Sequence, residues 1–317
     1  MDTAETRETA GTDDVGALYR RSVDWWSARV AAVTDDQWDL PTPCSEWTVR
    51  DLVNHVAGED LWTSPLMRGR TIADVGSRLD GDLLGEDPRG AAASAATEAV
   101  GTVDGTLPSH GTVQLSYGEE SMDEYVRQLV ADHLVHGWDL AVAIGQDRAL
   151  DPGLVAEVAA WFDGMEEAYR SGGAVGLRMP SGGDPQTDLL ARFGRDAAWG
   201  PTHAGFTAFV AAFGRGDVEA IMALMTDDCV FEATGPAPDG IRHEGAADVR
   251  SVWESLFTET GSPAFTAEES FVAGDRGVLR WRFSWVAPDG SPGHVRGVDV
   301  VRLRDGRVCE KLSYVKG

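Results

Sequence analysis

The stretch Asp132-His133-Leu134-Val135-His136-Gly137-Trp138-Asp139-Leu140 decides the fold of the first half of the chain. Residues 124–144 around it contain few helix breakers and predict a helix. Spacings of three and four place five of its side chains on one stripe: Tyr125, Leu129, Asp132, His136 and Leu140. Asp132 and His136 lie one turn apart on the stripe that should face the domain interior. Because burying an ionised carboxylate is costly, the pair predicts a cation opposite it, either a metal ion or a neighbouring Arg or protonated His.

The composition restricts the classes to which the protein can belong. At 317 residues the chain is too long for one ordinary core, so we expect two domains. A formal charge of -25 argues against nucleic-acid or anionic-membrane partners, because phosphate groups are bound by basic clusters. Three widely spaced cysteines argue against a disulfide framework and favour a reducing, cytoplasmic location. No apolar run has the length of a membrane span, and the polar residues 1–14 are interpreted as a disordered lead-in rather than a secretory signal.

Further helices flank the central one and predict an all-α bundle. Helical periodicity also covers residues 15–33, 45–58, 91–103, 151–169 and 188–193. Thr48 is the expected cap of the second of these helices. Four main helices with long connections form a bundle, and bundle interiors commonly hold metals supplied by facing helices. His55 lies on or near the inward stripe of the second helix, where it is either a core histidine bonded to a carbonyl or a ligand.

Two blocks of this half carry a family resemblance. They are Pro41-Thr42-Pro43-Cys44 followed by Trp47-x-Val49-x-x-Leu52-x-x-His55, and Asp132-x-x-x-His136-Gly137-Trp138-Asp139-Leu140. Residues 14–199 resemble the DinB-type metal-binding bundle and, more narrowly, the N-terminal domain of mycothiol-dependent maleylpyruvate isomerase; Gly194-Arg195-Asp196 resembles the close of such domains.

The resemblance implies a metal site. It assigns a divalent metal, usually zinc, to His55, Asp132 and His136, although the isomerase carries Glu where this chain has the shorter Asp132. His133 and Asp139 are nearby alternatives, but each points about 100° per residue step away from the neighbouring ligand positions.

Two imidazoles and one carboxylate suit catalysis, because three protein ligands leave a coordination position open for water or a thiol. A coordinated thiol is deprotonated at neutral pH, and the resemblance implies that this thiol is mycothiol, which would attack a small electrophilic substrate. The same donor set occurs in non-haem Fe(II) oxygenases, so donor type does not decide the metal. Cys44 could be a nucleophile, but a cysteine in a loop beside Trp47 more commonly contributes packing.

The pattern changes after residues 199–201 to helices followed by alternating strands. Helices are expected over 203–214, 217–226 and 246–257, and strands over 227–232, 265–272, 278–286, 294–303 and 307–315. Hairpin signals lie at 274–277, 288–290 and 304–306. Helices before an antiparallel run of strands predict an α+β domain whose sheet wraps the helices.

Residues 203–317 resemble the SnoaL-like branch of the NTF2-like cone fold. The carriers are Phe213-x-x-Gly216-Asp217, Asp227-Asp228 before a strand, and Arg296-Gly297-Val298-Asp299 leading to Asp305-Gly306-Arg307. The resemblance implies a pocket on the concave face of a curved antiparallel sheet, used for enolisation, cyclisation, hydration or ligand binding.

Within that cone, several side chains are candidates for the pocket. Trp281 and Phe283 alternate along one strand and are expected to form the pocket wall or to pack in the core. Asp299 lies on a face that should be apolar; the resemblance implies a general base, and the alternative is a bond to Arg or to the backbone. His243, in a loop before a helix, is a weaker candidate.

Three functions are compatible with this organisation. The first is a metal-dependent, mycothiol-using transferase or isomerase whose cone domain binds the organic substrate. The second is a cone-domain isomerase or cyclase with a structural metal bundle, and the third is a non-catalytic protein that binds or confers resistance to a small molecule. The resemblance to cone domains, which often dimerise through their sheets, is compatible with a homodimer, but the sequence does not decide the oligomeric state.

Overall fold

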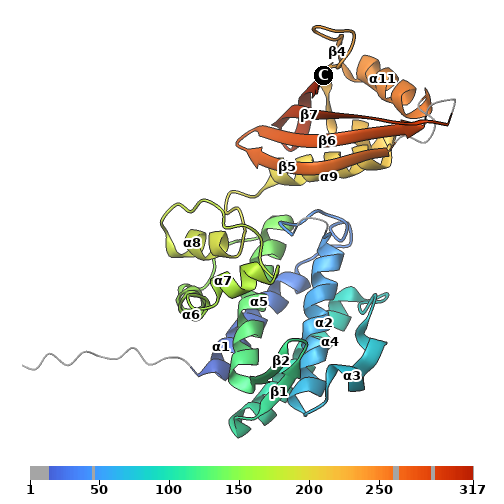
Figure 1. Ribbon diagram of the computed structural model, residues 1–317. Coiled ribbons are helices and arrows are strands. Elements are labelled where there is room, and N and C mark those ends of the chain that lie inside the picture. The colour runs from blue at the N-terminus through green and yellow to red at the C-terminus, as the bar shows by residue number, and fades with distance from the viewer. Residues whose placement is uncertain (1–13, 45–46, 260–263, 287–289, 317) are drawn as a thin grey trace, which may run out of the picture. The chain divides into compact units, whose positions relative to one another are not determined.

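The computed structural model describes residues 14–44, 47–259, 264–286 and 290–316 (Figure 1). The expected lead-in therefore lies outside the described residues except for Asp14, as do Ser45 and the Pro288-Asp289 part of a hairpin link. The chain divides into two compact units, the first ending at Ala198 and the second beginning at Trp199. In the described part of the chain, no helix combines the length and apolarity needed to cross a membrane.

Four long helices form the body of the first unit (Figure 1). They are α1 (Val15–Ala31), α2 (Val49–Met67), α4 (Pro88–Thr106) and α5 (Met122–Ala143). Helix α1 packs against α5 and α4, and α2 packs against α4 and α5. Shorter elements connect or follow them: α3 (Ile72–Val75), the 3-10 turns η1 (Gly76–Leu79) and η2 (Leu107–Ser109), the hairpin β1 (Thr112–Leu115) and β2 (Gly118–Ser121), α6 (Pro152–Phe162), α7 (Glu166–Ser171) and α8 (Pro185–Arg192).

The two helices that carry the candidate ligands begin at well-defined caps. Thr48 caps α2 as predicted, since its side chain accepts a hydrogen bond from the Asp51 amide while the Asp51 carboxylate accepts one from the Thr48 amide. Ser121 caps α5 by accepting from the Glu124 amide. The helix expected over 151–169 is divided into α6 and α7 by a turn that contains Gly164, a residue of low helix propensity.

Within its described residues, the second unit contains three helices and a six-stranded sheet. The helices are α9 (Pro201–Arg215), α10 (Val218–Ala223) and α11 (Ala246–Glu259). The sheet has the order β4-β3-β8-β7-β6-β5. Its strands are β3 (Met225–Glu232), β4 (Arg242–Glu244), β5 (Ala264–Ala273), β6 (Arg276–Val286), β7 (Pro292–Arg304) and β8 (Arg307–Val315). Neighbouring strands are antiparallel except β3 and β8, which are parallel.

The curved sheet packs its apolar face against the helices, with α9 lying along β5, β7 and β8 (Figure 1). The core contains Phe206, Phe209, Phe213, Trp253 and Trp281, all almost completely buried. The expected helix over 217–226 is too long: α10 ends at Ala223, and Met225 already pairs with β8. The fold is therefore α+β, as the alternation of polar and apolar residues indicated.

Candidate metal centre

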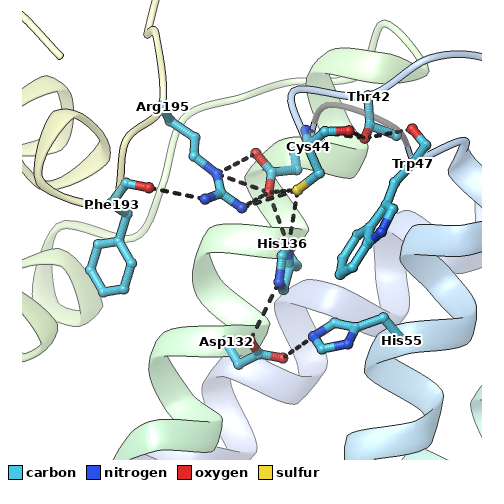
Figure 2. Close-up of polar contacts among 9 residues, drawn as sticks. Thr42, Cys44, Trp47, His55, Asp132, His136, Phe193 and Arg195 are labelled. Atoms are coloured by element: carbon cyan, nitrogen blue, oxygen red, sulfur yellow. Dashed lines mark hydrogen bonds and ion pairs between the residues drawn. The ribbon is translucent and has the colours of Figure 1, made fainter. Parts of the chain in front are cut away.

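Three candidate ligands converge between α2 and α5 (Figure 2). His55 comes from α2, and Asp132 and His136 come from successive turns of α5. His55 Nε2 lies 3.7 Å from Asp132 Oδ2, and His136 Nε2 lies 3.4 Å from Asp132 Oδ1. One donor atom from each residue lies within 4.8 Å of the others.

The spacing of these donors fits a small divalent cation. Ligand atoms about 2.1 Å from a tetrahedral zinc ion are roughly 3.4 Å apart, close to the two distances found here. Asp132 Oδ2 is buried and accepts no hydrogen bond within the described residues, so one lone-pair site on the carboxylate remains available. Two imidazoles and a carboxylate are also a donor set that zinc binds.

The charges of the cluster are strongly coupled. Burial opposes ionisation of Asp132, but His136 and His55 hold its pKa well below the usual range. Burial likewise opposes protonation of His136, yet Asp132 and the hydrogen bond to Asp139 raise its pKa well above the ordinary value. These shifts favour a protonated His136 whose charge would balance that of Asp132, and a bound metal ion would take the place of that proton.

Asp139 supports His136 from the opposite edge of the ring. Its Oδ2 lies 3.0 Å from His136 Nδ1, and Arg195 Nη2 donates to the same oxygen over 2.8 Å. Asp139 is fully buried and its pKa is lowered to about 2, so its carboxylate accepts a hydrogen bond from His136 Nδ1–H and directs Nε2 toward Asp132. From the sequence, Asp139 was expected only as an alternative ligand; its spacing of three residues from His136 is the signal that could have identified this role.

Cys44 belongs to the same polar network. Arg195 Nη2 donates to Cys44 Sγ at 3.0 Å, and the thiol donates to Asp139 Oδ2 at 3.2 Å. Burial, followed by the charge of Asp139, raises the pKa of the Cys44 thiol. The thiol also contacts the core that contains Leu52, so Cys44 combines packing with a polar contact and is poorly suited to act as a thiolate.

His133 points away from the cluster. Its Nδ1 donates to the Leu129 carbonyl at 2.7 Å, and its Nε2 lies 3.1 Å from Asp60 Oδ1, with both side chains fully buried. Glu59, one turn after His55 on α2, is affected by the charges of the cluster. Burial and then the charge of Asp132 raise the pKa of its carboxyl group. Glu59 was not expected at this site from the sequence, although its four-residue spacing from His55 places it on the same face of α2.

A cavity of about 600 Å³ opens beside the three candidate ligands. Besides them, its wall includes Trp47, Gln128, Trp161, Tyr169 and Arg195. The Trp47 indole covers the imidazoles, with ring centroids 4.8 Å from His55 and 5.9 Å from His136. The cluster therefore faces a space large enough for a small organic molecule.

A second cavity, of about 440 Å³, lies inside the second unit. Trp281 and Phe283 line it, and Gly297 leaves the room that the Trp281 indole occupies, since a Cβ there would come within 2.3 Å of the ring. Asp299 is fully buried beneath this cavity, 2.8 Å from Lys311 Nζ, a partner that the sequence analysis did not foresee.

His243 lies elsewhere in the second unit. It is on β4, its Nδ1 is 3.1 Å from Asp248 Oδ2, and its ring stacks on Phe231. His243 is not among the described residues that line the second cavity, because its side chain is engaged at the edge of the sheet. We therefore do not assign it to the pocket.

The fold and the cluster define a two-domain protein in which a helical DinB-like domain precedes an NTF2-like α+β domain. Residues 19–141 match the model of the mycothiol maleylpyruvate isomerase N-terminal domain, and residues 206–311 match that of the SnoaL-like domain. The chain belongs to these two domain families, as the sequence motifs predicted. The first family binds metal, and together the two support membership of an isomerase or cyclase group.

Relatives of the chain have been identified by sequence and by structure. The uncharacterized protein Rv0738 of Mycobacterium tuberculosis strain H37Rv is 34% identical over 144 residues, 44% of this chain and 72% of that protein. The uncharacterized protein MT0763 of strain CDC 1551 gives the same values. A solved NTF2-like protein of unknown function from Mesorhizobium loti is 41% identical, with 37% of this chain and 92% of that chain covered and a TM-score of 0.33.

Proposed function

We propose that this protein is a divalent-metal-dependent transferase or isomerase that activates a low-molecular-weight thiol against a small electrophilic substrate. Zinc is the proposed metal, and mycothiol is the proposed thiol. The observation that carries the proposal is the convergence of His55, Asp132 and His136 at the wall of a cavity of about 600 Å³. Membership of the maleylpyruvate isomerase N-terminal domain family supports the choice of thiol.

The residues around the cluster have separable tasks in this proposal. His55, Asp132 and His136 would hold the metal, while Asp139 fixes the His136 ring and Arg195 keeps Asp139 ionised. When bound, the metal would supply a positive charge that lowers the pKa of an incoming thiol and so generates a nucleophile at neutral pH.

The cavity wall would then position the two reactants. Trp47 excludes water from one side of the imidazoles, and Gln128 and Trp161 line the space in which the electrophile would lie. Trp161 is itself fixed, because its indole N–H donates to the Glu124 carboxylate at 3.0 Å. The wall thus offers an apolar surface of fixed orientation beside the reacting thiol.

Metal analysis and turnover together test this function. We expect the purified full chain to contain about one zinc ion, and Ala at His55, Asp132 or His136 to abolish both the metal content and thiol-dependent turnover. His110→Ala is the matched control, because His110 is an exposed histidine of the same unit whose partner is Asp123. Asp132→Glu restores the longer acid of the isomerase and should retain the metal. Unchanged metal content in all three Ala variants would refute the proposal.

The second unit supports a second candidate function, an isomerase or cyclase acting in its own cavity. The supporting observation is the buried Asp299 beneath an apolar cavity lined by Trp281 and Phe283. In that case Asp299→Asn would abolish turnover and chelation of the metal would not. A non-catalytic binding protein would instead show ligand-induced increases in melting temperature without any product.

A further inference from the structure

The second cavity contains a buried cation that the resemblance to SnoaL-like domains did not lead us to expect. Lys311 lies on β8 and is only 4% exposed. Its ammonium group is 2.8 Å from Asp299 Oδ2 and donates to Ser313 Oγ at 2.6 Å. Ser313 in turn donates to Asp299 Oδ1 at 2.6 Å. Lysine is almost never this buried unless it is paired, so the ammonium is an organised part of the domain.

Sheet register brings these three groups together. Asp299 on β7 is directly opposite Ser313 on β8, and Lys311 precedes Ser313 by two residues and so shares its face. Asp299 is not among the described residues that line the cavity, whereas Lys311 and Ser313 are. Lys311 therefore offers a hydrogen-bond donor to the cavity, and the Asp299 carboxylate lies behind Lys311.

The ammonium retains donor capacity after its two polar contacts. It has three N–H groups, of which one can serve Asp299 and one Ser313. Around it the rings of Phe213, Phe231 and Trp253 have centroids 5.2, 4.9 and 5.5 Å from Nζ. These rings stabilise the charge through cation–π contacts but provide no lone pair for the third N–H.

The remainder of the cavity is apolar apart from a few donors. Among the described residues that line it, Lys311 is the one with a formal charge. The indole N–H groups of Trp253 and Trp281 are buried and have no acceptor within the described part of the chain. Such a wall suits a flat, apolar molecule that carries oxygen acceptors.

We propose that Lys311 determines the specificity of this cavity, by donating its third N–H to the carbonyl oxygen of a planar ketone or quinone. A neutral carbonyl fits better than a carboxylate because Asp299 already balances the charge of Lys311. A second buried anion would have no counter-ion in the cavity. Asp299 then acts as a positioning residue that holds the ammonium in place, and the inference does not depend on the function proposed for the first unit.

Three matched naphthalene compounds test this assignment: 2-acetylnaphthalene, 2-ethylnaphthalene and 2-naphthoate. Binding to the full chain is measured by quenching of tryptophan fluorescence. We expect the ketone to bind roughly tenfold more tightly than the hydrocarbon, the ratio expected for one hydrogen bond from a charged donor. We expect the carboxylate to bind more weakly than the ketone.

The variants are chosen so that loss of folding cannot imitate the result. Lys311→Met combined with Asp299→Asn removes both charges of the pair, which leaves no unpaired charge in the core. This double variant should bind the hydrocarbon as the wild type does and lose the preference for the ketone. Lys316→Met, which alters an exposed lysine one residue beyond β8, should keep that preference. A preference that persists in the double variant, tighter binding of the carboxylate, or no binding of any compound to the wild type would each overturn the proposal.

Discussion

Each of the two cavities has an aspartate in or next to its wall, and the two aspartates are neutralised differently: Asp132 lines the first cavity and is partly exposed, whereas Asp299 is fully buried behind residues that line the second. In the first unit Asp132 is flanked by two imidazoles, and one of its oxygens accepts no hydrogen bond in the described structure. In the second unit Asp299 Oδ1 accepts a hydrogen bond from Ser313, whereas Oδ2 likewise accepts no hydrogen bond in the described structure but forms an ion pair with the Lys311 ammonium at 2.8 Å. In our proposal the first aspartate accepts a cation from solution, whereas the second already has a cation supplied by the chain.

This difference suggests how the two regions divide the chemistry. Imidazole is a neutral donor at high pH, so the first cluster can exchange a proton for a metal ion. An ammonium group in an ion pair has no lone pair for a metal, so the second cluster can only donate hydrogen bonds. We therefore infer that an external cation matters for the first cavity alone, and each of the following predictions tests one side of that contrast.

The largest effect on stability is expected in the second unit, from Asp299→Ala. This substitution leaves the Lys311 ammonium buried without its counter-ion, which should lower the free energy of unfolding by roughly 3–5 kcal/mol. Urea titration read out by hydrogen exchange of β7 and β8 measures it, because these strands report on the second unit alone.

A surface ion pair in the same unit provides the control. Asp228→Ala removes the partner of Arg304, and because both side chains are exposed and screened by solvent, the expected loss of stability is much smaller than for Asp299→Ala. Equal losses in the two variants would show that the Asp299–Lys311 pair contributes no more than a surface pair, and the contrast between the cavities would fail.

The sequence was most informative where function depends on spacing within one helix. Asp132 and His136 could be paired because four residues of helix place two side chains on one face. His55 was assigned to the same site only through the family resemblance, since periodicity alone does not show which helices face each other. The Pro-rich loop and Trp47 were part of that resemblance, and their placement against the imidazoles is visible only in the structure.

Contacts between distant segments could not be predicted. Arg195 reaches Asp139 across 56 positions of sequence, and no periodic pattern encodes that distance. Lys311 meets Asp299 because β7 and β8 pair in a particular register; alternation shows which residues share a face of a strand but not which residue lies opposite. Asp299 was therefore identified as an anomalous acid, while its actual partner was missed.

An intermediate effect is expected when the support of His136 is removed. Asp139→Asn keeps the shape of the side chain but removes the charge that accepts the Nδ1 proton and pairs with Arg195. We expect zinc affinity to fall about 10–100-fold, as is typical when the residue that orients a metal-bound histidine is lost. Competition with a fluorescent chelator measures the affinity.

The matched control for this variant is Asp60→Asn, which alters another fully buried aspartate that contacts a histidine of α5, His133. His133 points away from the cluster, so this change should reduce stability and leave the zinc affinity nearly unchanged. Comparable losses of affinity in both variants would indicate that general destabilisation, and not orientation of His136, controls metal binding.

The smallest expected effect is the change in zinc affinity for each unit of pH, which concerns the first cavity alone. In the folded, metal-free chain the pKa of His136 lies well above its ordinary value, although burial opposes this, because Asp132 and Asp139 favour the charged ring. A metal requires the neutral imidazole, so a proton competes with it at every pH below that pKa. Zinc affinity should therefore fall about tenfold for each unit by which the pH is lowered through the neutral range, and level off once the pH exceeds the pKa of His136.

Asp139→Asn sharpens this last prediction because it distinguishes the effect of the pKa of His136 from the effect of metal affinity at high pH. Losing the Asp139 carboxylate removes one of the groups that raise the pKa of His136, so the pH below which affinity declines should move downward even though the affinity at high pH is weaker. Isothermal titration at several pH values, with circular dichroism to verify folding at each, gives both quantities. Two results would contradict this explanation. One is a zinc affinity of the wild type that does not depend on pH. The other is a variant whose zinc affinity begins to decline at the same pH as that of the wild type. Either would mean that the metal does not replace a proton on His136.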